Sequence, residues 1–216
     1  MAPELNSTAY ALLGHIALRP WSAYELTRSL RRSLHWFWPR AESRIYDEAR
    51  KLVEAGLAIA TTERSGARNR TTYAATDAGR AALASWLATE ATTFAYHSEA
   101  LLRVHLAGFG TKDQLLRAVE GVDATAAAIL ADAREVATMY AEGRHPLQGD
   151  APVRALVVDH LVSLATALQA WARRTRHEVD FWDGLEADER KQREAIRRMT
   201  RAVQHLPARP TDDATS

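Results

Sequence analysis

Apolar residues recur at a helical spacing through most of this chain, and one stretch instead shows the alternation of a β-hairpin. The first 56 residues predict three helices, whose first residues are Asn6 or Ser7, Ser22, and Ala41 or Glu42. The buried stripe of the third helix consists of Ile45, Ala49, Leu52 and Val53. Gly56 is a typical residue for ending that helix.

The opposite face of the third predicted helix is polar and partly cationic. It carries Ser43, Arg44, Tyr46, Asp47, Arg50, Lys51 and Glu54. On an isolated helix such a face is most often simply solvated. The residues that follow it change this interpretation.

Directly after Gly56 the apolar spacing changes to a period of two. Leu57 and Ile59 alternate with alanines, two threonines follow, and a turn-like segment then leads into a second β-favouring run at residues 71–74. Three arginines surround this predicted turn: Arg64, Arg68 and Arg70. A polar helix followed by a basic two-stranded wing is the outline of a nucleic-acid-binding module, with the helix reading base edges and the wing holding phosphates.

Six short segments in this region resemble the PadR family of bacterial transcriptional regulators. They are Asn6–Gly14, Ala23–Leu26, Phe37–Pro39, Ser43–Tyr46, Leu52–Leu57 and Tyr73–Arg80, in the family's order. The resemblance implies a winged helix-turn-helix, with Tyr46 at the DNA face of the recognition helix. The family commonly has a small hydroxyl residue at the N-cap of that helix, whereas this chain has Ala41.

The second half of the chain reads as helix almost throughout. We expect helices at 99–107, from Thr111 onward, at 123–142, at 153–179 and at 186–205. Glu99–Val104 and Phe109–Gly110 are similar to the helical C-terminal domain of the PadR subgroup related to virulence-gene activators. That similarity implies a homodimer, and the wide apolar stripe of the helix at 153–179 also calls for a partner.

Composition restricts the remaining choices. Cysteine is absent, which removes disulfides and thiolate metal sites, and we found no apolar run of transmembrane length and no signal peptide. These features predict a cytoplasmic protein. Residues 1–80 hold 12 Lys/Arg against 8 Asp/Glu, a net charge of +4, whereas the remaining residues have a net charge of −3. The basic excess therefore lies with the helix-and-wing pattern, and its modest size predicts that two modules act together on DNA.

Two other functions compete with this interpretation. A helical metal-dependent enzyme would need converging ligands, but His97, Glu99, His105 and His160 lack the His-Glu-x-x-His spacing, and phosphate-loop and nucleophile-elbow motifs are also missing. A winged helix that binds protein would not need arginines at its wing tip. We therefore expect neither enzymatic activity nor a cofactor or metal.

The sequence thus predicts a mainly α protein in three parts. These are a winged helix-turn-helix DNA-binding domain at 1–90, a helical dimerisation and effector domain at 91–207, and a disordered tail at 208–216. Its function would be that of a homodimeric repressor on an inverted-repeat operator in double-stranded DNA, and not at a membrane. The residues expected to bind DNA are Ser43, Arg44, Tyr46, Arg50, Arg64, Arg68 and Arg70. An aromatic small-molecule effector would be bound by Trp86, Phe94, Trp171 and Trp182.

Overall fold

A computed structural model describes residues 5–38, 42–65, 68–91, 96–186, 188–204 and 206. Over these residues the chain is mainly helical with one small antiparallel sheet, which confirms the predicted fold class. It divides into two compact units, one formed by Met1–Tyr96 with Ala128–Ala165 and the other by His97–Ala127 with Thr166–Ser216. Two long helices contribute to both units, so the domain boundary at residue 90 stays a prediction.

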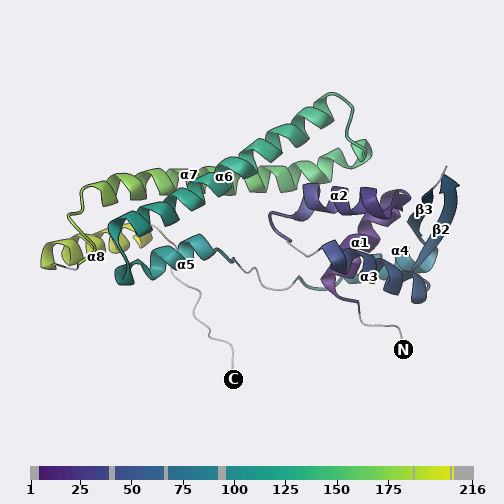
Figure 1. Cartoon of the computed structure of the whole chain (residues 1–216), viewed down its shortest axis with the longest axis horizontal. Helices are drawn as coiled ribbons and strands as arrows, with labels where there is room; N and C mark the ends of the chain where they lie inside the picture. Colours follow the sequence, from purple (N-terminus) through teal and green to yellow (C-terminus); the bar gives the residue numbers. More distant parts are fainter. Residues whose placement is uncertain are drawn as a thin grey trace, which may run out of the picture. The chain divides into compact units, whose positions relative to one another are not determined.

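The first unit begins with a winged helix-turn-helix. Its elements are α1 (Ser7–Leu18), β1 (Trp21–Ser22), α2 (Ala23–Leu34), α3 (Glu42–Glu54), β2 (Ala58–Ser65), β3 (Arg68–Ala75) and α4 (Asp77–Leu87) (Figure 1). Helix α1 supplies the centre of the core through Ala9, Leu12, Leu13 and Ile16, which are at most 2% exposed. Leu26, Ile45 and Leu52 bring α2 and α3 onto the same cluster. Burial of this apolar surface fixes how α3 is presented.

The helix starts follow the caps that the sequence predicts. Asn6 accepts a hydrogen bond from the Ala9 amide, and Thr76 accepts one from the Gly79 amide. Ser22 and Glu25 form a complete capping box at α2, and Thr111 and Gln114 exchange the same pair of bonds at the next long helix.

The sheet has the strand order β1-β3-β2, and all its pairs are antiparallel. Strands β2 and β3 form the wing, with a register from Ala58 opposite Ala75 to Ser65 opposite Arg68. The two-residue strand β1 was not predicted from the sequence. It pairs Trp21 with Tyr73 and Ser22 with Thr72, which holds the start of α2 beside the wing.

Over the described residues the second half has the predicted helices, with two of them joined into one and with the first and the last shorter than expected. They are α5 (Glu99–His105), η1 (Ala107–Phe109), α6 (Lys112–Ala141), η2 (Gln148–Asp150), α7 (Ala151–Asp180) and α8 (Glu189–Val203). The two helices predicted at 111 and at 123–142 form one continuous helix, α6, across Gly121. A glycine inside a helix costs about 1 kcal/mol. The burial of Val119, Val122 and Ala126 around it favours continuation.

Helix α7 also corrects the prediction that no segment reaches transmembrane length. Within Gln148–Asp180 an 18-residue window has a mean hydropathy of 1.4, and 6% of that window is buried. Asp159, His160 and Gln169 interrupt the apolar runs here, so a search for continuous apolar stretches passes over this helix. By length and composition alone this helix can cross a membrane; an exposed apolar face of this kind also suits packing against another protein.

The second unit has its own small core. Leu115 and Val119 of α6 meet Ala172 and Val179 of α7, and the Lys112 ammonium donates to the carbonyl oxygens of Asp180 and Trp182 at 2.8 Å each. The Arg176 guanidinium lies 2.6 Å from the Glu120 carboxylate and joins the same two helices.

His15 is a buried titratable group in the core of the first unit. Its Nδ1–H donates to the Ala11 carbonyl oxygen at 2.9 Å, and its side chain is 6% exposed. Burial is the main cause that lowers the pKa of His15 from 6.5 to about 4, and the nearby Arg154 cation lowers it further. His15 is therefore neutral in the folded protein at pH 7.

We predict that this histidine makes folding sensitive to mild acid. Because its pKa is lower in the folded state, the unfolded chain binds the proton first, and stability is lost as pH falls from about 6.5 towards about 4. Between pH 7 and pH 5, the free energy of unfolding should fall by about 2 kcal/mol more in the wild type than in His15→Gln. Urea unfolding at the two pH values measures this difference, and equal losses in both proteins would contradict it.

Candidate nucleic-acid interface and an adjoining cavity

Helix α3 presents a polar face because its other face is fixed in the core. Ile45, Ala49 and Leu52 are at most 6% exposed. Glu48 is also buried, and its Oε1 accepts hydrogen bonds from Asn6 Nδ2 at 3.2 Å and from Lys51 Nζ at 2.9 Å. These contacts join α3 to the start of α1 and set the rotation of α3 about its own axis.

Tyr46 and Arg50 lie on the outward face of α3, as predicted. The Tyr46 side chain is 49% exposed. The Arg50 guanidinium lies 3.6 Å from the Asp47 carboxylate and 3.7 Å from that of Glu54, along the surface of the same helix. Such exposed pairs contribute little stability, so Arg50 can exchange these carboxylates for another anion. The side chains of Ser43 and Arg44 lie outside the described part of the structure, and their roles stay predictions.

The wing places its one described arginine side chain in an unexpected environment. Arg70 was expected to face DNA, but its Nη2 donates to Glu25 Oε2 of α2 at 2.9 Å. Glu25 also belongs to the capping box of α2. The capping bonds from Ser22, together with Arg70, lower the pKa of Glu25 from 4.5 to about 2. The side chains of Arg64 and Arg68 lie outside the described residues.

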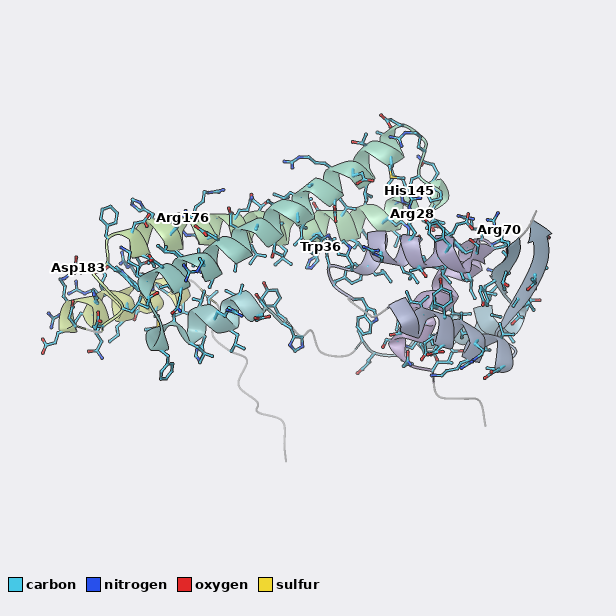
Figure 2. All side chains as sticks on the ribbon, viewed as in Figure 1. Arg28, Trp36, Arg70, His145, Arg176 and Asp183 are labelled. Carbon is cyan, nitrogen blue, oxygen red and sulfur yellow. The ribbon has the colours of Figure 1, made fainter. Side chains whose placement is uncertain are left out.

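A cavity of about 340 Å³ opens within the first unit, beside the winged helix-turn-helix. One wall comes from α2 and the residues around it, including Trp21, Arg28, Trp36 and Phe37. The other wall comes from α6, α7 and the loop between them, including Ile129, Asp132, Val136, Tyr140, His145, Arg154 and Leu161. Arg28, Trp36 and His145 are labelled among the lining residues, with Trp36 just after the end of α2 (Figure 2). The lining is thus aromatic and aliphatic with a few charged groups, the composition of a small-molecule site.

Most of the acidic groups of this cavity already have partners. Asp132 accepts a hydrogen bond from Trp36 Nε1 at 3.0 Å and lies 3.5 Å from His35 Nε2. Glu25 accepts hydrogen bonds from the Ser22 hydroxyl and from Arg70.

Two of the cationic side chains that line the cavity have fewer hydrogen-bond partners than its acidic groups. Arg28 has no hydrogen-bond or ion-pair partner among the described residues, and the buried Nε of Arg154 has no hydrogen-bond partner there. The cavity therefore suits a flat molecule with an anionic group.

The aromatic residues predicted to bind an effector do not line this cavity. Trp86 stacks on Tyr10 with a centroid distance of 4.7 Å and an interplanar angle of 9°. Trp171 and Trp182 pack against the core of the second unit, and Phe94 lies outside the described residues. The aromatic run at 34–38 instead supplies two lining residues of the cavity, Trp36 and Phe37.

No group of three or more His, Asp or Glu side chains able to hold a metal ion occurs among the residues that the structure describes. His97, His105 and His160 are all exposed.

The comparisons with known proteins agree on one family. Residues 12–85 match the Transcriptional regulator PadR-like family. The Negative transcriptional regulator PadR of Bacillus subtilis is 33% identical over 79 residues, which cover 36% of this chain and 43% of that protein. The match thus spans less than half of the relative's length.

Solved structures share the fold over a longer stretch. Bacillus subtilis PadR in complex with operator DNA has a TM-score of 0.67 at 20% identity, covering 81% of this chain and 99% of that one. The same protein in complex with p-coumaric acid has a TM-score of 0.61 at 19% identity, with the same coverage of both chains. At these identities the likeness extends the shared fold beyond the winged helix-turn-helix.

Proposed function

We propose that this chain, which belongs through residues 12–85 to the PadR-like family of transcriptional regulators, is a homodimeric repressor that a small aromatic anion releases from its operator. The observation that carries the proposal is the outward face of α3 beside a basic wing, on a fold shared with a regulator solved on operator DNA. The curated relative is a transcriptional regulator, and a solved structure of the same fold holds operator DNA, which supports DNA binding by this chain.

On DNA, α3 would enter the major groove and the wing would follow the backbone. Tyr46 is exposed on the α3 face, and Arg44 and Ser43 precede it by two and three residues in the helix. Arginine in the major groove reads guanine through two hydrogen bonds, whereas arginine on a wing holds phosphates without reading sequence. Arg44 and Arg68 therefore should have separable effects on binding.

A homodimer is favoured by the apolar surface of α7. Val153 is 69% exposed, Leu156 is 71% exposed and Val162 is 36% exposed, although all three lie in one helix. A second copy of the chain would cover this surface and would place two recognition helices on one inverted repeat.

An aromatic anion is favoured by the cavity. Trp21, Trp36 and Tyr140 supply flat apolar walls. Arg28 has no partner among the described residues, and the buried Nε of Arg154 makes no hydrogen bond there, although it lies 4.0 Å from the Asp150 carboxylate. p-Coumaric acid, the ligand solved with Bacillus subtilis PadR, combines a flat ring with a carboxylate. The alternative site remains the one predicted from sequence, at Trp86, Phe94, Trp171 and Trp182. A ligand would release DNA only if it bound the DNA-free arrangement more tightly.

The first prediction separates base reading from phosphate contact. On an operator selected from a random-sequence pool, Arg44→Ala should cost about 1–3 kcal/mol, with little effect on random DNA. Arg68→Ala should weaken binding to the operator and to random DNA alike. It should also reduce the slope of log affinity against log salt concentration by about one per wing. Fluorescence anisotropy at several salt concentrations measures both effects. Equal losses of Arg44→Ala on operator and random DNA would remove Arg44 from base reading, and wild-type protein that binds no DNA would favour a protein-binding winged helix.

The second prediction concerns assembly. Leu156→Glu should convert a homodimer into a monomer at micromolar concentration, because two charged side chains would have to be buried at the symmetric interface. Ile59→Glu, at a 54% exposed position on β2, is the control and should remain dimeric. Light scattering distinguishes the two states. A monomeric wild type would overturn the dimer.

The third prediction locates the effector. p-Coumarate should quench tryptophan fluorescence and release operator DNA over the same concentrations, and Arg154→Gln should weaken both effects about tenfold because it removes a charge-assisted bond. Trp36→Phe should lose much of the quenching, while Trp171→Phe should keep it. Quenching that is lost in Trp171→Phe and kept in Trp36→Phe would place the ligand in the second unit instead. Quenching without release would indicate an unrelated pocket.

A further inference from the structure

Arg70 of the wing is held by a residue from outside the wing. Its guanidinium bonds to Glu25 of α2 at 2.9 Å, with side-chain exposures of 55% and 35% respectively. Across the hairpin Arg70 lies opposite Glu63, yet the ion pair is made with α2. Figure 2 shows Arg70 on β3, at the side of the wing near the start of α2. The contact therefore ties the principal described cation of the wing to the body of the first unit.

Glu25 is fixed in place by its other bonds. Its Oε2 accepts from the Ser22 amide at 3.0 Å and from the Ser22 hydroxyl at 2.7 Å, and the same oxygen accepts from Arg70. Strand β1 pairs Ser22 with Thr72, two residues from Arg70, so the cap and the wing keep a constant spacing. With a pKa of about 2, the Glu25 carboxylate is charged at neutral pH. It is thus a rigid, permanent anion within reach of the wing arginine.

We propose that Glu25 competes with DNA phosphate for Arg70, and that ligand binding in the adjoining cavity, which Glu25 also lines, shifts this competition. A guanidinium pairs with a carboxylate and with a phosphate through the same N–H donors, so Arg70 cannot fully satisfy both. The Glu25–Arg70 pair is half exposed and consequently weak enough to exchange. This inference rests on the proposed function, because it concerns how the same DNA-binding surface is regulated.

The direction of the ligand effect follows from charge. Glu25 shares the cavity with Arg28 and Arg154, the two cations that an anionic ligand would occupy. Such a ligand adds negative charge on the side of Arg70 where Glu25 already lies. It therefore favours the paired, DNA-free state of Arg70, and by reciprocity DNA binding disfavours the ligand.

Glu25→Gln tests the competition with little change to the fold. Glutamine also serves in a capping box, so α2 keeps its start while the charge that holds Arg70 is removed. The full-length variant should bind DNA about threefold to tenfold more tightly when two wings act together. Its salt slope should be steeper by about one per wing, because Arg70 then reaches a phosphate. Both gains should vanish in an Arg70→Gln background.

Glu63→Gln is the matched control. It removes a carboxylate from the wing itself, opposite Arg70 in the register, and it should not reproduce the dependence on Arg70. Two results would overturn the competition. One is a gain in DNA affinity from Glu25→Gln that is the same with and without Arg70. The other is no gain in affinity from a Glu25→Gln variant whose thermal unfolding matches that of the wild type. A wild-type protein that binds no DNA would overturn the proposed function. In that case the competition between Glu25 and DNA would stand only if Glu25→Gln produced DNA binding that depends on Arg70.

The ligand is tested with p-coumarate. The loss of DNA affinity that it causes in the wild type should be smaller in Glu25→Gln and in Arg70→Gln, since both variants lack the pair that the ligand favours. An equal loss in all three proteins would show that the cavity acts on DNA binding by another route and would overturn this part of the inference.

Discussion

The pairing of Trp21 and Ser22 with the wing is the constraint on which the first unit depends. Strand β1 has only these two residues, yet it sets Trp21 opposite Tyr73 and Ser22 opposite Thr72. The Trp21 ring is 2% exposed, and its indole N–H donates to the His15 carbonyl oxygen at 2.8 Å, close to the end of α1. One residue thus joins the end of α1, the sheet, the start of α2 and a wall of the cavity. Ser22 then caps α2, so every position in that helix is fixed relative to the wing.

The winged helix-turn-helix has fewer unpaired cations than its net charge suggests, because some of its arginines are paired with carboxylates. A net charge of +4 over residues 1–80 predicts free cations for a polyanion. In the structure Arg70 is paired with Glu25, and Arg50 lies between Asp47 and Glu54. Each arginine must give up a carboxylate before it can hold a phosphate. Under the proposed function, the affinity for DNA would reflect this exchange of partners, which a nearby anion would influence.

Helix α7 has two surfaces with different chemistry. Arg154, Val158 and Leu161 line the cavity, while Val153 and Leu156 lie exposed. One helix thereby contributes to a cavity beside the DNA-binding elements and to a surface that calls for a partner. Under the proposed function, this arrangement would couple ligand binding to assembly and to DNA binding.

The sequence by itself determined the features that depend on neighbouring residues. Helix periodicity, the helix starts near Asn6, Ser22 and Thr111, and the alternation of the wing all depend on residues close together in the chain, so their positions were predicted closely. The fold class and the outward face of α3 followed from them. The family resemblance added the order of the elements.

Only the tertiary structure decided the contacts between distant residues. Nothing in the local pattern pairs β1 with β3, brings Glu25 to Arg70 across 45 residues, or sets Trp36 against Asp132 across 96 residues. These contacts depend on how complete elements pack, and α6 continues through Gly121 because the apolar residues on either side are buried. Polar pairing and cavity shape are consequences of that packing, and this is why the sequence predicted the outward polar face of α3 but not the partner of Arg70 or the cavity.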